Sequence, residues 1–153
     1  MTAARFSRLR LFRFVALVTC IMSMLVSTNT ARAEPGTQSE LTAITGAGAG
    51  QVLVSPTAAG QGTFVAQVTV NIHNAAPNTA FAVTRAVDSL ADGHCTSSVF
   101  ATVATLTTSE SGAGAVHFVR ESALVSGTQF DLMLRVIGDG TVLESECMTV
   151  TVK

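Results

Sequence analysis

The side chains best suited to metal or acid–base chemistry are three histidines and the acidic residues near one of them. His94 shares a short polar stretch with Asp92 and Asp88, and imidazole and carboxylate groups are common ligands of transition metals. His73 and His117 lie in strand-like stretches, and no two histidines have the i, i+2 or i, i+4 spacing that presets two ligands. Ordinary solvent-facing positions account better for all three, so metal binding at His94 is the alternative hypothesis and not the first.

The sequence contains no motif that indicates the reaction centre of an enzyme. No Gly-x-Ser-x-Gly nucleophile elbow occurs. Glu144 and Glu146 share one face of a predicted strand, with α-carbons roughly 7 Å apart, but the chain has no Trp or Tyr to form a sugar platform. The glycine-rich residues 46–50 precede a strand and not a helix, which excludes a phosphate-binding loop. We therefore expect a non-catalytic protein without a cofactor.

The cysteine residues predict one disulfide. Cys20 lies in the N-terminal apolar segment, which leaves Cys95 and Cys147 as the thiols of the remaining chain. In an oxidising compartment two cysteines have one intramolecular pairing available. This bond closes a loop of about fifty residues, for which the loop entropy gives a stabilisation on the order of 4 kcal/mol. A reactive cysteine or a metal thiolate is the less favoured alternative.

The N-terminal residues 1–33 have the features of a cleaved export signal. Four arginines precede an apolar run at residues 14–26, and no acidic residue occurs in the segment. The run is about thirteen residues, roughly 20 Å as a helix, which is shorter than a hydrocarbon core of about 30 Å. The Ala-Arg-Ala sequence at 31–33 has the small residues that signal peptidase accepts, so we predict cleavage after Ala33. Lipidation at Cys20 and retention as an uncleaved anchor are the alternatives.

Removal of this segment makes the exported chain acidic. The segment holds five of the nine basic residues and none of the ten acidic ones, so a charge of about −6 remains at pH 7. The remaining basic residues are isolated from one another in the sequence: Arg85, Arg120, Arg135 and Lys153. No basic stripe is available to neutralise a phosphate backbone, which argues against nucleic acid as a partner. No second apolar segment reaches about eighteen residues, so we expect no membrane insertion after cleavage.

A flexible lead-in and a β domain are predicted after the signal. Residues 34–50 are rich in Gly, Ala and Thr and have few sizeable apolar side chains, so we expect a flexible spacer there. From residue 51 onward, β-branched residues alternate with polar ones, and Gly or Pro interrupts every helical period. This pattern predicts seven strands, at residues 51–55, 64–72, 79–87, 99–106, 115–120, 130–137 and 141–152.

The last two predicted strands form a hairpin around Asp139-Gly140, because Asp-Gly favours the positive φ angles of a type I′ turn. This turn places Arg135 opposite Glu144, a cross-strand pair worth under about 1 kcal/mol. The same register makes three further pairs: Ile137 with Val142, Val136 with Leu143, and Leu132 with Cys147. Three later apolar residues then fall on the outer face, so we predict a bulge at residues 146–148 that turns them inward: Met148, Val150 and Val152.

Seven short strands and one disulfide predict an all-β domain at residues 51–153, a two-layer antiparallel β-sandwich of immunoglobulin-like architecture. The chain has no Trp or Tyr, so the buried Trp and the tyrosine corner of antibody-type domains are missing. The likeness is therefore one of architecture. It implies no activity, because sandwiches of this kind carry many unrelated functions.

These observations favour a secreted or extracytoplasmic module with a non-catalytic binding or structural role, whose partner is a macromolecule or an envelope component. Rigid β scaffolds present binding residues on loops, so the loops at residues 88–97 and 107–114 are the expected contact surfaces. The alternative from another class is an extracytoplasmic metal-binding protein that uses His94 with Asp92 and Asp88.

Overall fold

The computed structural model describes residues 36–58 and 62–153, so the predicted signal and its cleavage point lie outside the described residues. Every described strand pair is antiparallel, which confirms the predicted all-β, antiparallel class. Among the described residues, no helix is long and apolar enough to cross a membrane. The described strands are β1 (Thr37–Thr45), β2 (Ala49–Ala58), β3 (Phe64–His73), β4 (Ala80–Asp88), β5 (Ala101–Thr107), β6 (Gly114–Ser122), β7 (Gln129–Gly138), β8 (Thr141–Ser145) and β9 (Met148–Thr151).

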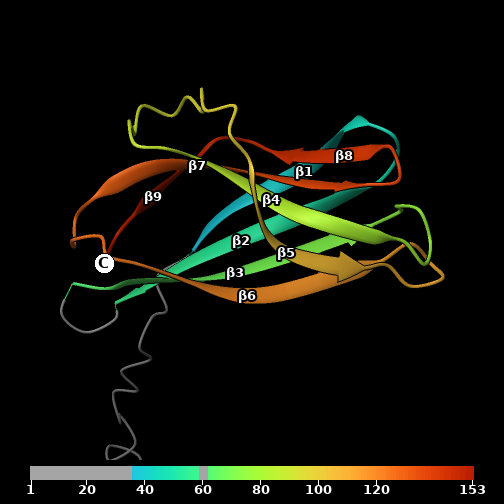
Figure 1. Ribbon diagram of the computed structural model, residues 1–153, viewed down its shortest axis with the longest axis horizontal. Coiled ribbons are helices and arrows are strands. Elements are labelled where there is room, and N and C mark those ends of the chain that lie inside the picture. The colour runs from blue at the N-terminus through green and yellow to red at the C-terminus, as the bar shows by residue number, and fades with distance from the viewer. Residues whose placement is uncertain (1–35, 59–61) are drawn as a thin grey trace, which may run out of the picture. The chain divides into compact units, whose positions relative to one another are not determined.

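Hydrogen bonds join the described strands into one sheet. Its order is β5-β4-β7-β8-β1-β2-β3-β6, and β9 pairs with the part of β7 that β8 leaves unpaired. The sheet curls until its outer strands, β5 and β6, approach each other, and the result is nearly a barrel (Figure 1). The predicted sandwich of seven strands in two layers differs from this arrangement, because the pairing of β1 with β8 connects the two halves into one sheet.

Residues 37–50, predicted as part of a flexible lead-in, instead form β1, a short turn at 46–48 and the start of β2. β1 lies between β2 and β8 and pairs with both. The buried side chains of this strand are Ser39 and Leu41. A strand that is paired on both sides satisfies its backbone groups without large apolar side chains, so the composition of the segment does not reveal it.

The last predicted strand, residues 141–152, is two strands separated by two residues. Both β8 and β9 pair with β7. Where the ladder is interrupted, the backbone N–H of Leu134 on β7 donates to Ser145 Oγ at 3.0 Å, so this buried donor keeps a partner. The interruption turns the later apolar residues inward, as predicted, and all three are buried: Met148, Val150 and Val152.

The hairpin around Asp139-Gly140 is confirmed, with φ angles of 47° and 70° at these two residues. Arg135 faces Glu144 and forms an ion pair with it. The predicted pairs of Val136 with Leu143 and of Ile137 with Val142 are also present. Beyond the interruption the register moves by one residue, so Leu132 faces Met148 and not Cys147. The turn therefore fixes the register only as far as the next irregularity.

The hydrophobic core lies inside the curled sheet and is formed by alternate, inward-facing residues of neighbouring strands. β3 confirms the clearest predicted alternation, since five of its residues are buried on one face: Phe64, Ala66, Val68, Val70 and Ile72. Opposing strands supply the largest fully buried residues, which are Phe81, Leu134, Leu143 and Leu41. The core is built mainly from β-branched and leucine side chains because the chain has no Trp or Tyr.

We expect Leu41→Ala to lower the free energy of unfolding by about 2–5 kcal/mol, because truncation of a buried leucine leaves a cavity in the core. Ile44→Ala is the matched control, since Ile44 lies on the same strand and is 53 % exposed; its expected effect is within about 0.5 kcal/mol. Urea unfolding followed by far-ultraviolet circular dichroism measures both changes. Equal effects of the two substitutions would contradict the position of β1 in the sheet.

Candidate ligand-binding site

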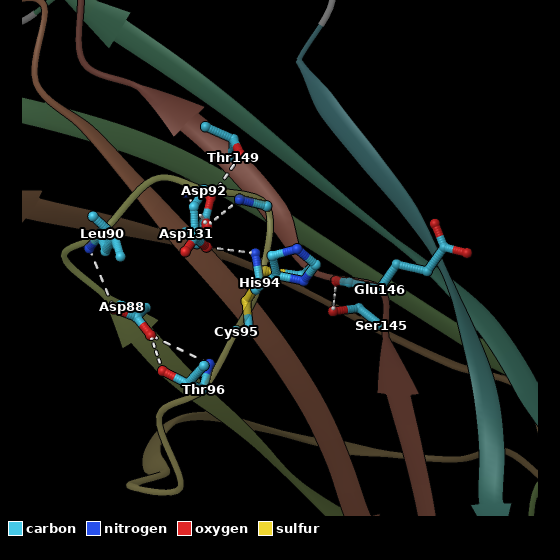
Figure 2. Close-up of a disulfide and its surroundings, with 12 residues drawn as sticks. Asp88, Leu90, Asp92, His94, Cys95, Thr96, Asp131, Ser145, Glu146 and Thr149 are labelled. Carbon is cyan, nitrogen blue, oxygen red and sulfur yellow. Dashed lines mark hydrogen bonds between the residues drawn. A yellow bond between two sulfur atoms is a disulfide. The ribbon is translucent and has the colours of Figure 1, made fainter.

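The loop between β4 and β5 carries the residues predicted for metal binding and one half of the disulfide. Cys95 in this loop is bonded to Cys147, which lies between β8 and β9, and their α-carbons are 5.5 Å apart. The predicted disulfide is therefore confirmed. It connects the loop to the last two strands, next to the start of β7 (Figure 2).

Asp131 on β7 is the polar centre of this region, and its side chain is fully buried. One carboxylate oxygen accepts the backbone N–H groups of Asp92 at 3.0 Å and of Gly93 at 2.7 Å. The other accepts the Thr149 hydroxyl at 2.6 Å. The Thr149 hydrogen bond, helped by the N–H groups of the loop, holds the pKa of Asp131 below its ordinary value, although burial acts to raise it. The ionised carboxylate therefore fixes the loop on β7.

Asp88, at the end of β4, is a second residue that holds the loop in place. Its carboxylate accepts the Thr96 hydroxyl at 2.6 Å and the backbone N–H groups of Thr96 and Leu90, each at 3.2 Å. The hydrogen bond from the Thr96 hydroxyl is the main cause that lowers the pKa of Asp88. Asp92 Oδ1 accepts the N–H of His94 at 2.9 Å in a local turn. The two acids predicted as metal ligands are thus acceptors for the loop itself (Figure 2).

Within the part of the chain that the structure describes, no group of three His, Cys, Asp or Glu residues is placed to hold a metal ion. His94 is exposed in the loop, and His73 is exposed at the end of β3. His117 lies on β6, with Nδ1 3.0 Å from the hydroxyl of Thr69. The three histidines therefore lie on separate elements, and metal binding at His94 stays a prediction that this geometry does not favour.

A cavity of about 370 Å³ lies at the end of the curled sheet where β4 and β6 end. Eleven of the eighteen described residues that line it are apolar, among them Phe64, Phe118 and Phe130. The rings of Phe64 and Phe130 meet edge to face, with centroids 5.9 Å apart. Arg85 and Arg120 belong to the polar part of the lining. The cavity therefore combines apolar walls with a small number of charged groups.

The cavity lies where β5 and β6 separate. No ladder joins these two among the described strands. They meet near their connecting loop, where Gly114 lies against Leu106, and they diverge away from that loop (Figure 1). Across the separation, Arg120 Nη2 donates to the backbone carbonyl of Val103 on β5 at 3.0 Å. A side chain thus bridges the two strands where a backbone ladder would close a barrel.

Sequence reasoning does not find either of two features described above, the role of Asp131 and the cavity. Asp131 has no recognisable role in the sequence, because the loop residues it binds are 38 and 39 positions away. One feature of the sequence could have indicated the cavity: Arg85 follows Phe81 and Val83 on the same face of a predicted strand. A charged residue in an inward-facing series marks a place where the core ends.

Comparison with protein-family models, with curated proteins and with solved structures finds no match to this chain. The function is therefore argued from the geometry of the described residues. Of the features above, the cavity has the size and the lining of a small-molecule site.

We expect Asp131→Asn to lower the urea midpoint at pH 7 and to lose part of this effect in acid. The pKa of Asp131 is lower in the folded chain than the value of about 3.9 for an unfolded aspartate. Its ionised form therefore stabilises the fold above about pH 4, and this contribution is lost as the pH falls through the folded-state pKa. The difference between the urea midpoints of the two proteins should be constant above about pH 4 and should narrow as the pH falls below this value. A constant difference down to pH 2 would contradict this role of the carboxylate.

Proposed function

We propose that this chain is an exported, non-catalytic binding protein that holds an apolar ligand in the cavity at the open end of its sheet. The observation that carries the proposal is the cavity itself, about 370 Å³ in volume with mainly apolar walls. Small-molecule sites are typically apolar hollows of about 300–1,000 Å³ with a few polar groups that orient the ligand. Sheets of about eight strands that curl into a barrel have room inside for one small ligand.

The volume of the cavity supports a binding role over a packing irregularity. Protein interiors are packed as densely as organic crystals, and voids larger than a water molecule are few. The apolar lining of an open cavity lacks contact atoms on one side, and so it loses dispersion energy. A ligand with apolar surface restores these contacts and removes the lining from water, which provides the driving force for binding.

The cavity is a stronger candidate site than the loops, which remain predicted contact surfaces for a macromolecule or an envelope component. Residues 88–97 are held by the disulfide and by Asp131. The loop at 108–113 is held by backbone hydrogen bonds from Ala75 N to Gly112 O and from Asn78 N to Ser109 O, both 3.1 Å long. An immunoglobulin-like sandwich would favour such loops as the site, whereas a single curled sheet favours its interior.

Export is part of the proposal, supported by the N-terminal sequence and by the disulfide, which persists in oxidising compartments. Intact mass spectrometry of the untagged chain from its export compartment tests this part. We expect a mass that begins at Glu34 and gains the two hydrogens of one disulfide after reduction. A mass that includes Cys20 with an added lipid, or that is unchanged by reductant, would overturn it.

Binding is tested with N-phenyl-1-naphthylamine, a neutral apolar dye whose emission increases in apolar surroundings. We expect saturable binding by the exported chain and an affinity about tenfold weaker in Val103→Trp, which corresponds to about 1.4 kcal/mol. Val103 is half-buried and lines the cavity, so the larger side chain occupies the space of the ligand.

Val119→Trp is the matched control for this experiment. Val119 lies on β6 next to a cavity residue, but it is 50 % exposed and does not belong to the described lining. The same side chain is therefore added outside the cavity, and dye affinity should stay unchanged. Circular dichroism and urea midpoints of both variants establish that the fold is kept. Equal dye binding by two folded variants would reject the cavity as the site.

A further inference from the structure

We infer that the ligand of this cavity is a single-chain anionic amphiphile, with its apolar chain in the cavity and its acidic head between Arg85 and Arg120. The inference rests on the proposed function and adds the charge and the shape of the ligand. Carboxylate, sulfate and phosphate monoester heads all present oxygen acceptors that a guanidinium binds through charge-assisted hydrogen bonds.

Both arginines continue the inward face of an apolar strand. On β4, Phe81 and Val83 are fully buried, and Arg85 is the next residue on their face. On β6, Phe118 lines the cavity, and Arg120 follows it on the same face. Residues two apart in a strand share a face, so the change from apolar to cationic occurs on both strands at the cavity.

Neither arginine has a carboxylate partner among the described residues. The described ion pair joins Arg135 to Glu144, which do not belong to the cavity lining. Arg120 gives one N–H to the carbonyl of Val103, and a guanidinium has five N–H donors. Within residues 36–58 and 62–153, the guanidinium of Arg85 forms no hydrogen bond or ion pair. Donors for an anion are therefore present on two sides of the cavity.

The placement of these arginines is informative because the chain has few cations. Outside the predicted signal it carries four basic and ten acidic residues. The described lining of this cavity includes two of the four basic residues and one acid, Glu121, and all three side chains are exposed. Two guanidinium groups and one carboxylate give the cavity a positive local charge in an acidic protein. This charge complements an anionic ligand and opposes a cationic one.

The volume limits the length of the apolar chain. An engineered apolar cavity of about 150 Å³ holds benzene, so on that scale a volume of about 370 Å³ holds roughly ten to fifteen carbon atoms. A linear chain of about ten carbons satisfies this limit and leaves its head group at the arginines. Decanoate is therefore the probe of choice.

Protection of a sheet edge is the other physical explanation for an inward-facing charge. It applies to Arg120, because β6 is an outer strand of the sheet. It does not apply to Arg85, because β4 lies between β5 and β7. The cavity that both arginines line accounts for both positions.

The test is a fluorescence titration of the full exported chain with the substitution Phe118→Trp. Because the protein has no other tryptophan, the emission reports on the cavity wall alone. The probes are decanoate, decanol and decyltrimethylammonium, which have equal chains and negative, neutral and positive heads. The two charged probes are kept below their micelle concentrations, and decanol is kept below its solubility limit. We expect decanoate to bind about tenfold more tightly than decanol, and decyltrimethylammonium to bind most weakly. The Val119→Trp chain, with its reporter outside the cavity, should show no spectral shift.

Three arginine variants in the reporter chain locate the head group. Arg85→Gln and Arg120→Gln should each reduce the preference for decanoate over decanol, whereas Arg135→Gln should keep it. Calorimetric titration of the chain without the reporter repeats the comparison, so a reporter that disturbs the fold does not decide the result. Circular dichroism of each variant establishes that it is folded.

The possible outcomes distinguish a failure of the inference from a failure of the proposed function. Equal affinities for the three probes would overturn the inference and leave the apolar site standing. No binding of any probe by the folded protein would overturn both. An unchanged preference in the Arg85→Gln and Arg120→Gln variants would also overturn the inference, and would leave edge protection as the role of Arg120. Binding of phosphatidylglycerol vesicles without binding of monomeric decanoate would assign the arginines to a lipid surface and overturn it as well.

Discussion

A curled sheet closes into a barrel when the backbone groups of its two outer strands hydrogen-bond to each other, and in this chain those strands are β5 and β6. They lie together near Gly114 and diverge beyond it, so the carbonyl of Val103 accepts a hydrogen bond from the Arg120 side chain instead. The interior stays open at that end as a result. Residues such as Phe118, which a closed barrel would bury, line the cavity. The position at which β5 and β6 diverge therefore determines where the candidate site lies.

The parts of the fold that depend on nearby residues were predictable. The Asp139-Gly140 sequence itself favours the turn that it forms. After Glu146 the apolar residues change to the other face of the strand, which indicates that the strand is interrupted. The closure into one sheet depends instead on β1, whose partners are far along the chain. Ser39 Oγ, for example, accepts the backbone N–H of Glu146, 107 residues later, at 2.9 Å. No local pattern shows such a contact, so the β1 segment resembles a spacer in the sequence.

The candidate site was harder to predict because the residues that most resemble a site in the sequence lie outside the cavity and have structural partners. Asp88 and Asp92 resemble metal ligands in the sequence, yet their carboxylates accept hydrogen bonds from the loop that carries them. Most of the cavity lining is apolar and has the same alternation as core residues, so it carries no sequence signal of its own. Arg85 and Arg120 depart from this alternation. Their meaning depends on knowing that both strand faces point into one interior.

The start of β7 forms one wall of the cavity, and contacts on the opposite face of this strand hold it in place. Phe130 and Leu132 line the cavity, where less packing is available to hold them. Asp131, between them in sequence, points the opposite way, and its buried carboxylate binds the 88–97 loop and Thr149 of β9. The Cys95–Cys147 bond ties that loop to the β8–β9 junction. The polar cluster and the disulfide thus add support to the outer face of this wall. A wall fixed in this way would lose little conformational entropy on binding the proposed ligand, which would favour affinity.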